Sequence, residues 1–452
     1  MASTLTHNSA FPLSALAWAN TPGPTPYAPS PNLLQRPQAI AHSPEASFRL
    51  AVGSYIEDYS NQIQVLGLSS SLPLTDADAP PTGNDGGDFN VLAQAHHGYP
   101  ATKVAWEPST SNPHSPLKRG RSELLASSSD VLKIWEYAES NNTQNTHNQG
   151  YVHHHSQPIT NTPSHSLSLV SQLTPKAPGT AAPLTSFSWN ETIPSRIVTC
   201  SIDTTCTVWD LDTRTAITQL IAHDREVYDV SWLPRSSDIF VSVGADGSLR
   251  AFDLRSLEHS TILYETSSPT SSTTDTTKKH QQQQQQQQQR SSAPLLRLAF
   301  NPHDSNYLAT FRHDSGEVNI LDMRSPGAPV TNIRAHRQGV SSMAWKPDGS
   351  LLATGSDDCA VHVWDIKGNK DKDKGRGMSR QNSTSSNRAS VMKESVLSHR
   401  GTSQVHNLAW SSYSAFYNVR HPSTLYPSGG GAYGVDDWIA VASGNQVKVL
   451  KL

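Results

Sequence analysis

Residues 197–265 contain one short unit almost twice over, and this internal repeat constrains the fold more than any other feature of the chain. Each copy has a run rich in β-branched and aromatic residues, an Asp-containing turn, and a second such run that ends in an aromatic residue followed by Asp. The first copy ends at Trp209-Asp210 and the second at Phe252-Asp253, 43 residues later. A unit of this length and ending is typical of a four-stranded propeller blade, which buries its faces only against neighbouring copies.

The same pattern recurs along the chain. A predicted inner strand with an aromatic residue near its end occurs seven times, at residues 16–18, 103–108, 185–190, 227–234, 296–302, 340–347 and 405–410. A predicted third strand, usually with alternating apolar and polar residues, also occurs seven times, at 62–68, 131–137, 205–211, 248–254, 317–323, 360–366 and 445–450. Because such alternation favours half-buried strands, the sequence predicts seven blades.

Polar inserts make the spacing between the repeats irregular. Their composition cannot bury enough apolar surface to offset the entropy of ordering, so we expect them to be disordered. They lie at about 20–47, 69–88, 108–122, 138–166, 266–293, 367–392 and 411–436. Without these roughly 170 residues, about 40 remain for each of seven blades. We therefore predict an all-β fold, a single seven-bladed WD40 β-propeller over residues 1–452 with long disordered loop inserts.

The ring is expected to close through the N-terminal segment. The last predicted third strand, residues 445–450, reaches the end of the sequence and leaves its blade without an outer strand. A strand at residues 4–7 is a candidate for that place, and its pairing would cover an exposed sheet edge. We expect deletion of residues 1–14 to destabilise the ring.

Polar residues recur at fixed offsets and predict a buried hydrogen-bond chain. In the sixth repeat Asp358 and Thr354 lie six and ten residues before Trp364, and His336 precedes them. We expect hydrogen bonds from Asp to His, from His to Thr, and between Thr and the indole N–H. The third repeat keeps the offsets with Thr199, Asp203 and Trp209, and the fourth with His223, Ser242, Asp246 and Phe252. Phe252 has no indole donor, so the fourth chain should be one link short.

These residue types also occur in catalytic triads. A group that recurs in blade after blade satisfies polar atoms, however, whereas a single active site needs only one copy. We therefore expect no enzyme activity, no small-molecule substrate and no cofactor. A reproducible turnover lost on changing one pocket residue would support the enzyme alternative.

Charge and cysteine content narrow the classes of partner. The formal net charge of -3 gives no basic face, so neither direct nucleic-acid binding nor membrane binding is expected. The three cysteines form no C-x-x-C pair, which favours reduced thiols. The histidines at 153–155 lack zinc-ligand spacing, so no metal site is predicted.

Three short basic motifs are weak candidates for regulation. Residues 118–122, Lys-Arg-Gly-Arg-Ser, fit a localisation signal, a kinase site or simply a solvated loop. Arg380-Gln-Asn-Ser383 and Arg388-Ala-Ser390 are plausible phosphorylation sites.

Several stretches resemble one WD-repeat family, and together they cover nearly all the predicted blades and none of the long inserts. This family contains the plant transparent-testa-glabra and anthocyanin-regulator proteins and the animal cullin-4-associated WD factor that binds dual-specificity kinases. The matching stretches are residues 48–57, 99–108, 183–210, 218–229, 242–265 and 295–310, with Thr-Gln-Leu-Ile-Ala-His-Asp-Arg-Glu-Val-Tyr-Asp at 218–229 the most specific. The resemblance implies a non-enzymatic scaffold in nucleus and cytoplasm. Its expected partners are protein kinases and transcription factors of the basic-helix-loop-helix and MYB types.

The resemblance also implies an alternative role as a substrate receptor of a cullin-4 ubiquitin ligase. Receptors of that kind often carry Trp-Asp-x-Arg after the third strand. Residues 252–255 (Phe-Asp-Leu-Arg) and 321–324 (Leu-Asp-Met-Arg) keep Asp and Arg without Trp, whereas residues 209–212 (Trp-Asp-Leu-Asp) lack Arg. The ligase role therefore stays open, as do the identity of the partners and the face that binds them. The candidate partner-binding residues are Arg225, Glu226, Tyr228, Arg255, Glu258, His259 and Arg324.

Overall fold

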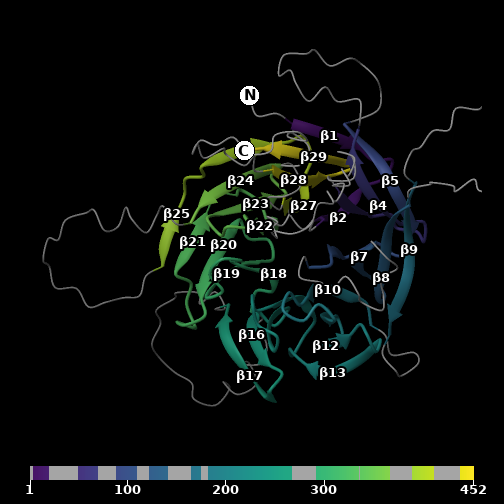
Figure 1. Cartoon of the computed structure of the whole chain (residues 1–452). Helices are drawn as coiled ribbons and strands as arrows, with labels where there is room; N and C mark the ends of the chain where they lie inside the picture. The colour runs from purple at the N-terminus through teal and green to yellow at the C-terminus, as the bar shows by residue number, and fades with distance from the viewer. Residues whose placement is uncertain are drawn as a thin grey trace, which may run out of the picture.

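The described part of the computed structural model forms a closed ring of seven antiparallel sheets, which confirms the predicted seven-bladed β-propeller (Figure 1). It covers residues 4–19, 49–69, 88–108, 122–140, 164–174, 182–266, 292–334, 336–366, 389–411 and 438–452. Most sheets have four strands, and one has five.

The blades follow one another in chain order, and each runs from an inner to an outer strand. Blades 1 and 2 are β2 (Leu13–Trp18), β3 (Leu50–Ser54), β4 (Gln62–Leu68) and β5 (Phe89–His96), then β6 (Lys103–Trp106), β7 (Ser122–Ser128), β8 (Leu132–Ser140) and β9 (Ser164–Leu173). Blades 3 and 4 are β10 (Leu184–Trp189), β11 (Arg196–Ser201), β12 (Thr205–Asp210) and β13 (Thr215–Ile221), then β14 (Val227–Trp232), β15 (Ile239–Gly244), β16 (Ser248–Asp253) and β17 (Ser256–Glu265).

The remaining blades show two departures from this order. Blade 5 is β18 (Leu295–Phe300), β19 (Tyr307–Arg312), β20 (Glu317–Asp322) and β21 (Thr331–Arg334), with β25 (Ser390–Met392) added in parallel outside β21. Blade 6 is β22 (Val340–Trp345), β23 (Leu351–Ser356), β24 (Ala360–Asp365) and β26 (Leu397–Arg400). Blade 7 is β27 (Val405–Trp410), β28 (Trp438–Ser443), β29 (Gln446–Lys451) and β1 (Thr4–Asn8).

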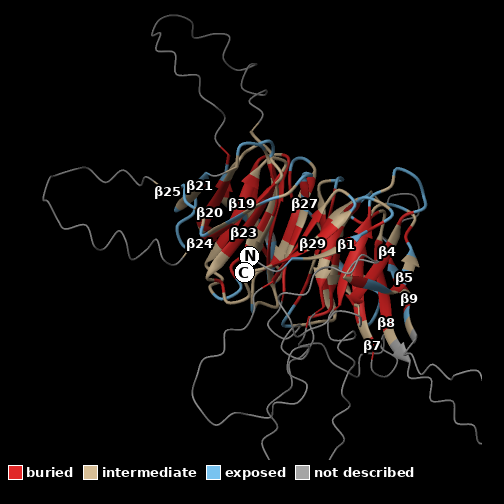
Figure 2. Cartoon of the chain, turned by 90° about the horizontal axis from the view of Figure 1, so that it is seen from above, coloured by how far each residue is buried: buried red, intermediate tan, exposed pale blue. Residues whose placement is uncertain are grey.

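The ring closes through β1, which supplies the outer strand of blade 7. Five residue pairs join it to β29, from Thr4↔Leu450 to Asn8↔Gln446, so the two described ends of the chain lie side by side (Figures 1 and 2). Residues 13 and 14 fall within the segment 1–14 whose deletion is expected to destabilise the ring, but they belong to the inner strand of blade 1. A deletion that tests ring closure must therefore stop at residue 8.

The hydrophobic core is divided into layers between adjacent blades. One cluster joins Val65 of blade 1 to Val104 and Leu125 of blade 2. Equivalent clusters lie at each of the other six blade junctions, including the junction of blades 7 and 1. Burying one such side chain contributes about 1.5–3 kcal/mol. Because every cluster contains residues of two adjacent blades, this stabilisation comes from contacts that no single blade makes alone.

The aromatic residue near the end of the inner strand has a second role in four of the seven blades. Four of these indole N–H groups donate to an inner-strand carbonyl of the preceding blade at 3.0–3.1 Å: Trp18 to Ala409, Trp106 to Ala17, Trp232 to Ser188 and Trp345 to Ala299. Trp189 instead donates to Pro194 of its own blade, and Phe300 has no N–H to give. The recurring aromatic residue therefore links blades as well as filling space.

Two of the expected inserts are shorter than predicted. Residues 138–140 and 164–166 lie in the paired strands β8 and β9, and residues 390–392 form β25. Their serine-rich composition suggested loops, but single apolar residues such as Leu167 and Met392 are buried and hold these segments in the sheets. The other expected inserts lie almost wholly outside the described residues.

Candidate interaction surfaces

The sixth blade contains the predicted hydrogen-bond chain in full. Trp364 Nε1 donates to Thr354 Oγ1 at 3.0 Å, His336 Nε2 lies 2.8 Å from the same oxygen, and His336 Nδ1 lies 3.4 Å from both carboxylate oxygens of Asp358. Asp358 also accepts the backbone N–H of Arg337 at 3.0 Å. The side chains of His336 and Asp358 are 2% and 7% exposed, so the chain is sealed inside the blade.

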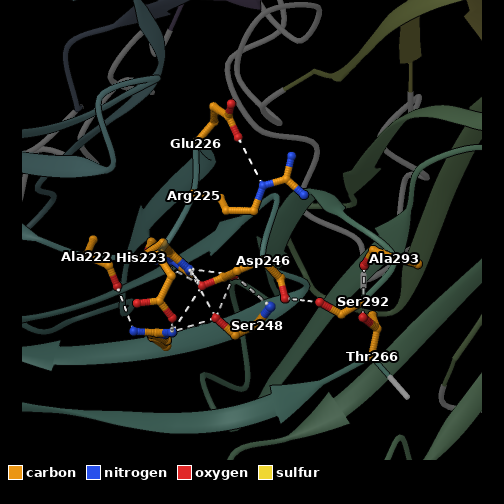
Figure 3. A network of polar contacts seen from close by, with 12 residues as sticks. Ala222, His223, Arg225, Glu226, Asp246, Ser248, Thr266, Ser292 and Ala293 are labelled. Carbon is orange, nitrogen blue, oxygen red and sulfur yellow. Dashed lines mark hydrogen bonds and ion pairs between the residues drawn. The ribbon is translucent and has the colours of Figure 1, made fainter. Parts of the chain in front are cut away.

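The fourth blade has the same chain without its indole, as expected from Phe252 (Figure 3). His223 Nε2 lies 2.7 Å from Ser242 Oγ, and His223 Nδ1 lies 3.0 Å from Asp246 Oδ1. Arg250 extends this chain to the surface, because its Nη2 lies 3.0 Å from Asp246 and 2.8 Å from the exposed Asp224. Burial alone would raise the pKa of Asp246. The hydrogen bond and the charge of His223, together with hydrogen bonds from Ser248, hold that pKa well below its usual value.

The Gly-Ala-Asp-Gly turn at residues 244–247 shapes this part of blade 4. Gly247 has a φ of +75°, and a Cβ there would clash with Thr266 Oγ1. Thr266 Oγ1 donates to the Ala293 carbonyl at 2.9 Å, and Ser292 donates to the Asp246 carbonyl. The turn is therefore enclosed by Thr266 on one side and by Ser292 and Ala293 on the other (Figure 3). The glycine is therefore explained by turn geometry.

The second blade holds a chain that the sequence offsets did not reveal. Trp135 Nε1 donates to Ser127 Oγ at 2.8 Å, and His97 Nε2 lies 3.1 Å from that oxygen. Ser127 lies eight residues before Trp135 because it pairs with Lys133, five residues across the hairpin, whereas seven residues separate the pairs Thr199↔Thr207 and Thr354↔His362 in blades 3 and 6. A search that allowed a variable turn length would have found it.

The third blade keeps only part of the predicted chain. Trp209 Nε1 donates to Thr199 Oγ1 at 2.9 Å, as expected. Asp203, however, is exposed, and its carboxylate caps the turn by accepting from Thr205. Since it contacts no histidine among the described residues, Asp203 does not belong to a buried chain.

Hydrogen-bond partners and burial determine the protonation state of His336 and His97. The Asp358 carboxylate can only accept, so it takes a hydrogen from His336 Nδ1, and in the neutral imidazole His336 Nε2 then accepts from the Thr354 hydroxyl. Burial, opposed by Asp358 and reinforced by His362, lowers the pKa of His336 to about 4. Burial likewise lowers the pKa of His97 to about 4. Neutral imidazoles with both nitrogens occupied are structural links and are not available as general bases.

A cavity of about 420 Å³ lies among the inner strands. Its most buried acid is Asp229, which is 3% exposed. Asp229 accepts from Ser186 Oγ at 2.6 Å and from the backbone N–H of Leu298 at 3.0 Å, and Lys103 Nζ lies 3.7 Å away. These partners come from blades 2, 3 and 5, so this carboxylate ties the ring together and has little capacity left for a substrate.

The candidate partner-binding residues lie on two opposite faces and on the rim of the ring. Successive turns of an antiparallel blade alternate between two sides of the ring. We call the side with the turns between second and third strands the top face, and the side with the turns between third and fourth strands the bottom face. Arg225 and Glu226 precede β14 on the top face, 3.7 Å apart, with side chains 55% and 42% exposed. Tyr228 follows them half-buried in β14.

Arg255 and Arg324 occupy equivalent bottom-face turns of the neighbouring blades 4 and 5. Arg255 binds Asp253 of its own turn through Nη2 at 2.6 Å, and Arg324 binds Asp322 at 2.7 Å. The hydrogen bonds from Arg255 lower the pKa of Asp253 to about 2. Arg324 also lies against the ring of Tyr307, with its guanidinium carbon 5.5 Å from the ring centroid. Both guanidinium groups are thus held in place, yet the two side chains are 67% and 59% exposed.

The remaining candidates lie on the rim. His259 is exposed in the outer strand β17. Glu258 is in the same strand, and its side chain is outside the described part of the structure. The seven candidates therefore do not form one patch.

Metal and membrane features are lacking in the part of the chain that the structure describes. No group of three or more His, Cys, Asp or Glu side chains there is placed to hold a metal ion. The histidines at 153–155 lie outside it. The described residues also include no helix that is both long and apolar enough to cross a membrane.

Comparison with known proteins identifies the family. A profile described as "WD domain, G-beta repeat" matches residues 214–253 and 327–365. Over 406 residues the chain is 34% identical to a DDB1- and CUL4-associated factor 7 homolog of Dictyostelium discoideum, with 90% of this chain and 92% of the relative covered. It is 40% identical over 320 residues to an uncharacterized WD repeat-containing protein of Schizosaccharomyces pombe, covering 70% of this chain and 64% of that protein. A WD repeat-containing protein of Saccharomyces cerevisiae is 36% identical over 320 residues, with 70% and 54% covered. The chain therefore belongs to the WD40-repeat family of DDB1- and CUL4-associated factor 7.

Proposed function

We propose that this protein is a non-enzymatic scaffold that assembles protein complexes containing protein kinases, transcription regulators or both, in nucleus and cytoplasm. One observation carries the proposal. The buried histidines 97, 223 and 336 and the cavity carboxylate Asp229 are taken up by hydrogen bonds within and between blades, whereas charged side chains are held exposed on two opposite faces. A rigid ring with two such faces suits the simultaneous binding of peptides from different partners.

The top-face pair and the bottom-face pair are the best places to test this function. Arg225 and Glu226 lie at the surface in a stretch that the repeat itself does not require. Arg255 and Arg324 are oriented by their own-turn carboxylates, which lowers the entropy lost when a partner binds them.

The experiment is a quantitative affinity purification of the tagged full chain and two double variants. Arg225→Ala with Glu226→Ala alters the top face, and Arg255→Ala with Arg324→Ala alters the bottom face. If each face serves its own partners, each variant loses a different subset of co-purifying kinases and regulators. Identical recoveries for all three proteins would reject these residues as binding sites. Recovery of no kinase or transcription regulator by the unaltered chain would reject the proposal itself.

A substrate receptor of a cullin-4 ubiquitin ligase is the alternative. It is favoured by the DDB1- and CUL4-associated factor named in the Dictyostelium relative, and by the shared position of Arg255 and Arg324 in adjacent turns. The absence of Trp from both turns weakens it. This role requires DDB1 to co-purify with the full chain and to be reduced by Arg255→Ala with Arg324→Ala. A purification without DDB1 would exclude the ligase role and leave the scaffold role intact.

A further inference from the structure

The fifth strand of blade 5 comes from the neighbouring blade. β25 lies in the connection between β24 and β26 of blade 6, yet it pairs in parallel with β21 of blade 5 (Figure 1). Three residue pairs join the strands: Thr331↔Ser390, Asn332↔Val391 and Ile333↔Met392. The segment therefore covers the outer edge of one blade with chain that belongs to the next.

Few contacts hold β25 in place. Met392 is its one buried side chain, and it packs into the cluster between blades 5 and 6 beside Ile333. Val391 is 46% exposed. The entropy lost in ordering three residues at an edge is comparable with the gain from burying one methionine. Attached and detached states of β25 are therefore close in free energy, which is the property that a switch needs.

The first residue of the strand makes the polar contacts that fix its register. The backbone N–H of Ser390 donates to the Val330 carbonyl at 3.0 Å. The Ser390 hydroxyl lies 2.8 Å from Thr331 Oγ1 and 3.3 Å from the same Val330 carbonyl. Ser390 is exposed, so an enzyme can reach this hydroxyl whenever the strand detaches.

A phosphate on Ser390 would meet acceptors rather than cations. Esterification removes the hydroxyl hydrogen and places negative oxygens beside the Val330 carbonyl. Side chains alternate between the faces of a strand, so Ser390 shares the face of Thr331 and Ile333, whereas Arg334 lies on the other face. Arg334 is moreover paired with Glu317 at 2.7 Å. Within β21, whose residues are all described, no cationic side chain lies on the Ser390 face.

We propose that Ser390 is a phosphorylation site for a basophilic serine/threonine kinase, and that its phosphorylation detaches β25 and uncovers the outer edge of β21. The sequence Arg388-Ala389-Ser390 supplies the basic residue that such kinases recognise. The kinase transfers the γ-phosphoryl group of ATP to Ser390 Oγ, the bond to the β-phosphate breaks, the hydroxyl proton passes to the kinase base, and ADP leaves. Because only the detached strand fits a kinase cleft, the modification traps that state.

The test treats the full chain with the catalytic subunit of a cyclic-AMP-dependent protein kinase and ATP. Mass spectrometry locates the phosphate, and hydrogen–deuterium exchange follows peptides covering residues 389–396 and 330–334. We expect phosphate at Ser390 and exchange about tenfold faster or more in both segments, with the other blades unchanged. The variant Ser390→Ala should lose this phosphate, and kinase treatment should leave its exchange unchanged.

The matched control is Val391→Glu, which adds a negative charge to the same strand but on its opposite face. It should leave exchange slow. Three results would overturn the proposal: no phosphate at Ser390, phosphate at Ser390 with exchange unchanged, or an equal acceleration in unphosphorylated Val391→Glu. The last result would mean that any charge detaches the strand and that the Ser390 hydroxyl has no special part.

Discussion

Trp364 Nε1 lies 3.0 Å from Thr354 Oγ1, so the indole donates to the same oxygen that His336 Nε2 contacts. Burial keeps the His336 imidazole neutral, and the Asp358 carboxylate, which can only accept, takes its Nδ1 hydrogen. His336 Nε2 therefore accepts from the Thr354 hydroxyl, 2.8 Å away. Blade 4 has Phe252 in place of the tryptophan, so Ser242 Oγ contacts His223 Nε2 without an indole donor beside it.

Trp364→Phe should destabilise the protein by about 1–3 kcal/mol, because a buried hydrogen bond is lost and a small void is left. Trp209→Phe is the matched control, since it removes the same bond to Thr199 in a blade without a described histidine partner. Both variants should shift the urea midpoint, but only Trp364→Phe should change the titration of a histidine followed by NMR. A histidine titration unchanged in Trp364→Phe would contradict the ordered chain.

Stability should fall as pH decreases from about 6.5 to about 4. Burial lowers the pKa of His336 and of His97 to about 4 in the folded state, whereas an unfolded histidine titrates near 6.5. The unfolded chain therefore binds protons first, and each histidine reduces stability by about 3 kcal/mol across this window before the loss levels off. Urea unfolding at several pH values measures the slope. His336→Gln should flatten it and the exposed control His259→Gln should not; equal slopes in all three proteins would refute the assignment.

Removal of residues 1–8 should lower the unfolding temperature and broaden the transition. β1 satisfies the edge of β29 through five residue pairs, and Leu5 packs against the cluster between blades 7 and 1. Deletion exposes that edge and part of the cluster. A protein lacking only residues 2 and 3 is the control. Equal unfolding temperatures in calorimetry would show that β1 does not hold the ring closed.

Arg255→Ala with Arg324→Ala should leave the unfolding midpoint unchanged. Both arginines are mostly exposed, and ion pairs in such positions add little to stability. Circular dichroism during thermal unfolding checks this directly. A clear drop in the unfolding midpoint would mean that the two arginines stabilise the fold. A loss of binding in the same variant could then not be assigned to a lost contact with a partner.

The sequence was sufficient for those features that repeat. The aromatic residue near the end of each inner strand, the alternation of the third strands and the missing outer strand of the last blade together led to the observed ring. The offsets of Thr354 and Asp358 from Trp364 led to the observed hydrogen-bond chain.

Features that depend on turn length or on contacts distant in sequence were not predictable in this way. The chain through His97 does not follow the offsets because the hairpin beyond Ser127 is two residues shorter, and the position of Asp203 is not predictable because no offset shows whether a histidine lies opposite. Sequence composition predicts a loop at β25, because the apolar surface that buries Met392 belongs to another blade. No pattern in the sequence revealed that Arg225 and Arg255 lie on opposite faces.

The central claim is that the ring itself, and not its polar inserts, holds the partners. Cross-linking mass spectrometry with amine- and carboxyl-reactive reagents tests it on affinity-purified complexes. It compares the full chain with a version in which residues 70–87, 141–163 and 267–291 are replaced by short Gly-Ser linkers. The scaffold account predicts cross-links from partners to top-face and bottom-face turns that persist in the shortened protein. Cross-links confined to the inserts, with partners lost on shortening, would contradict it.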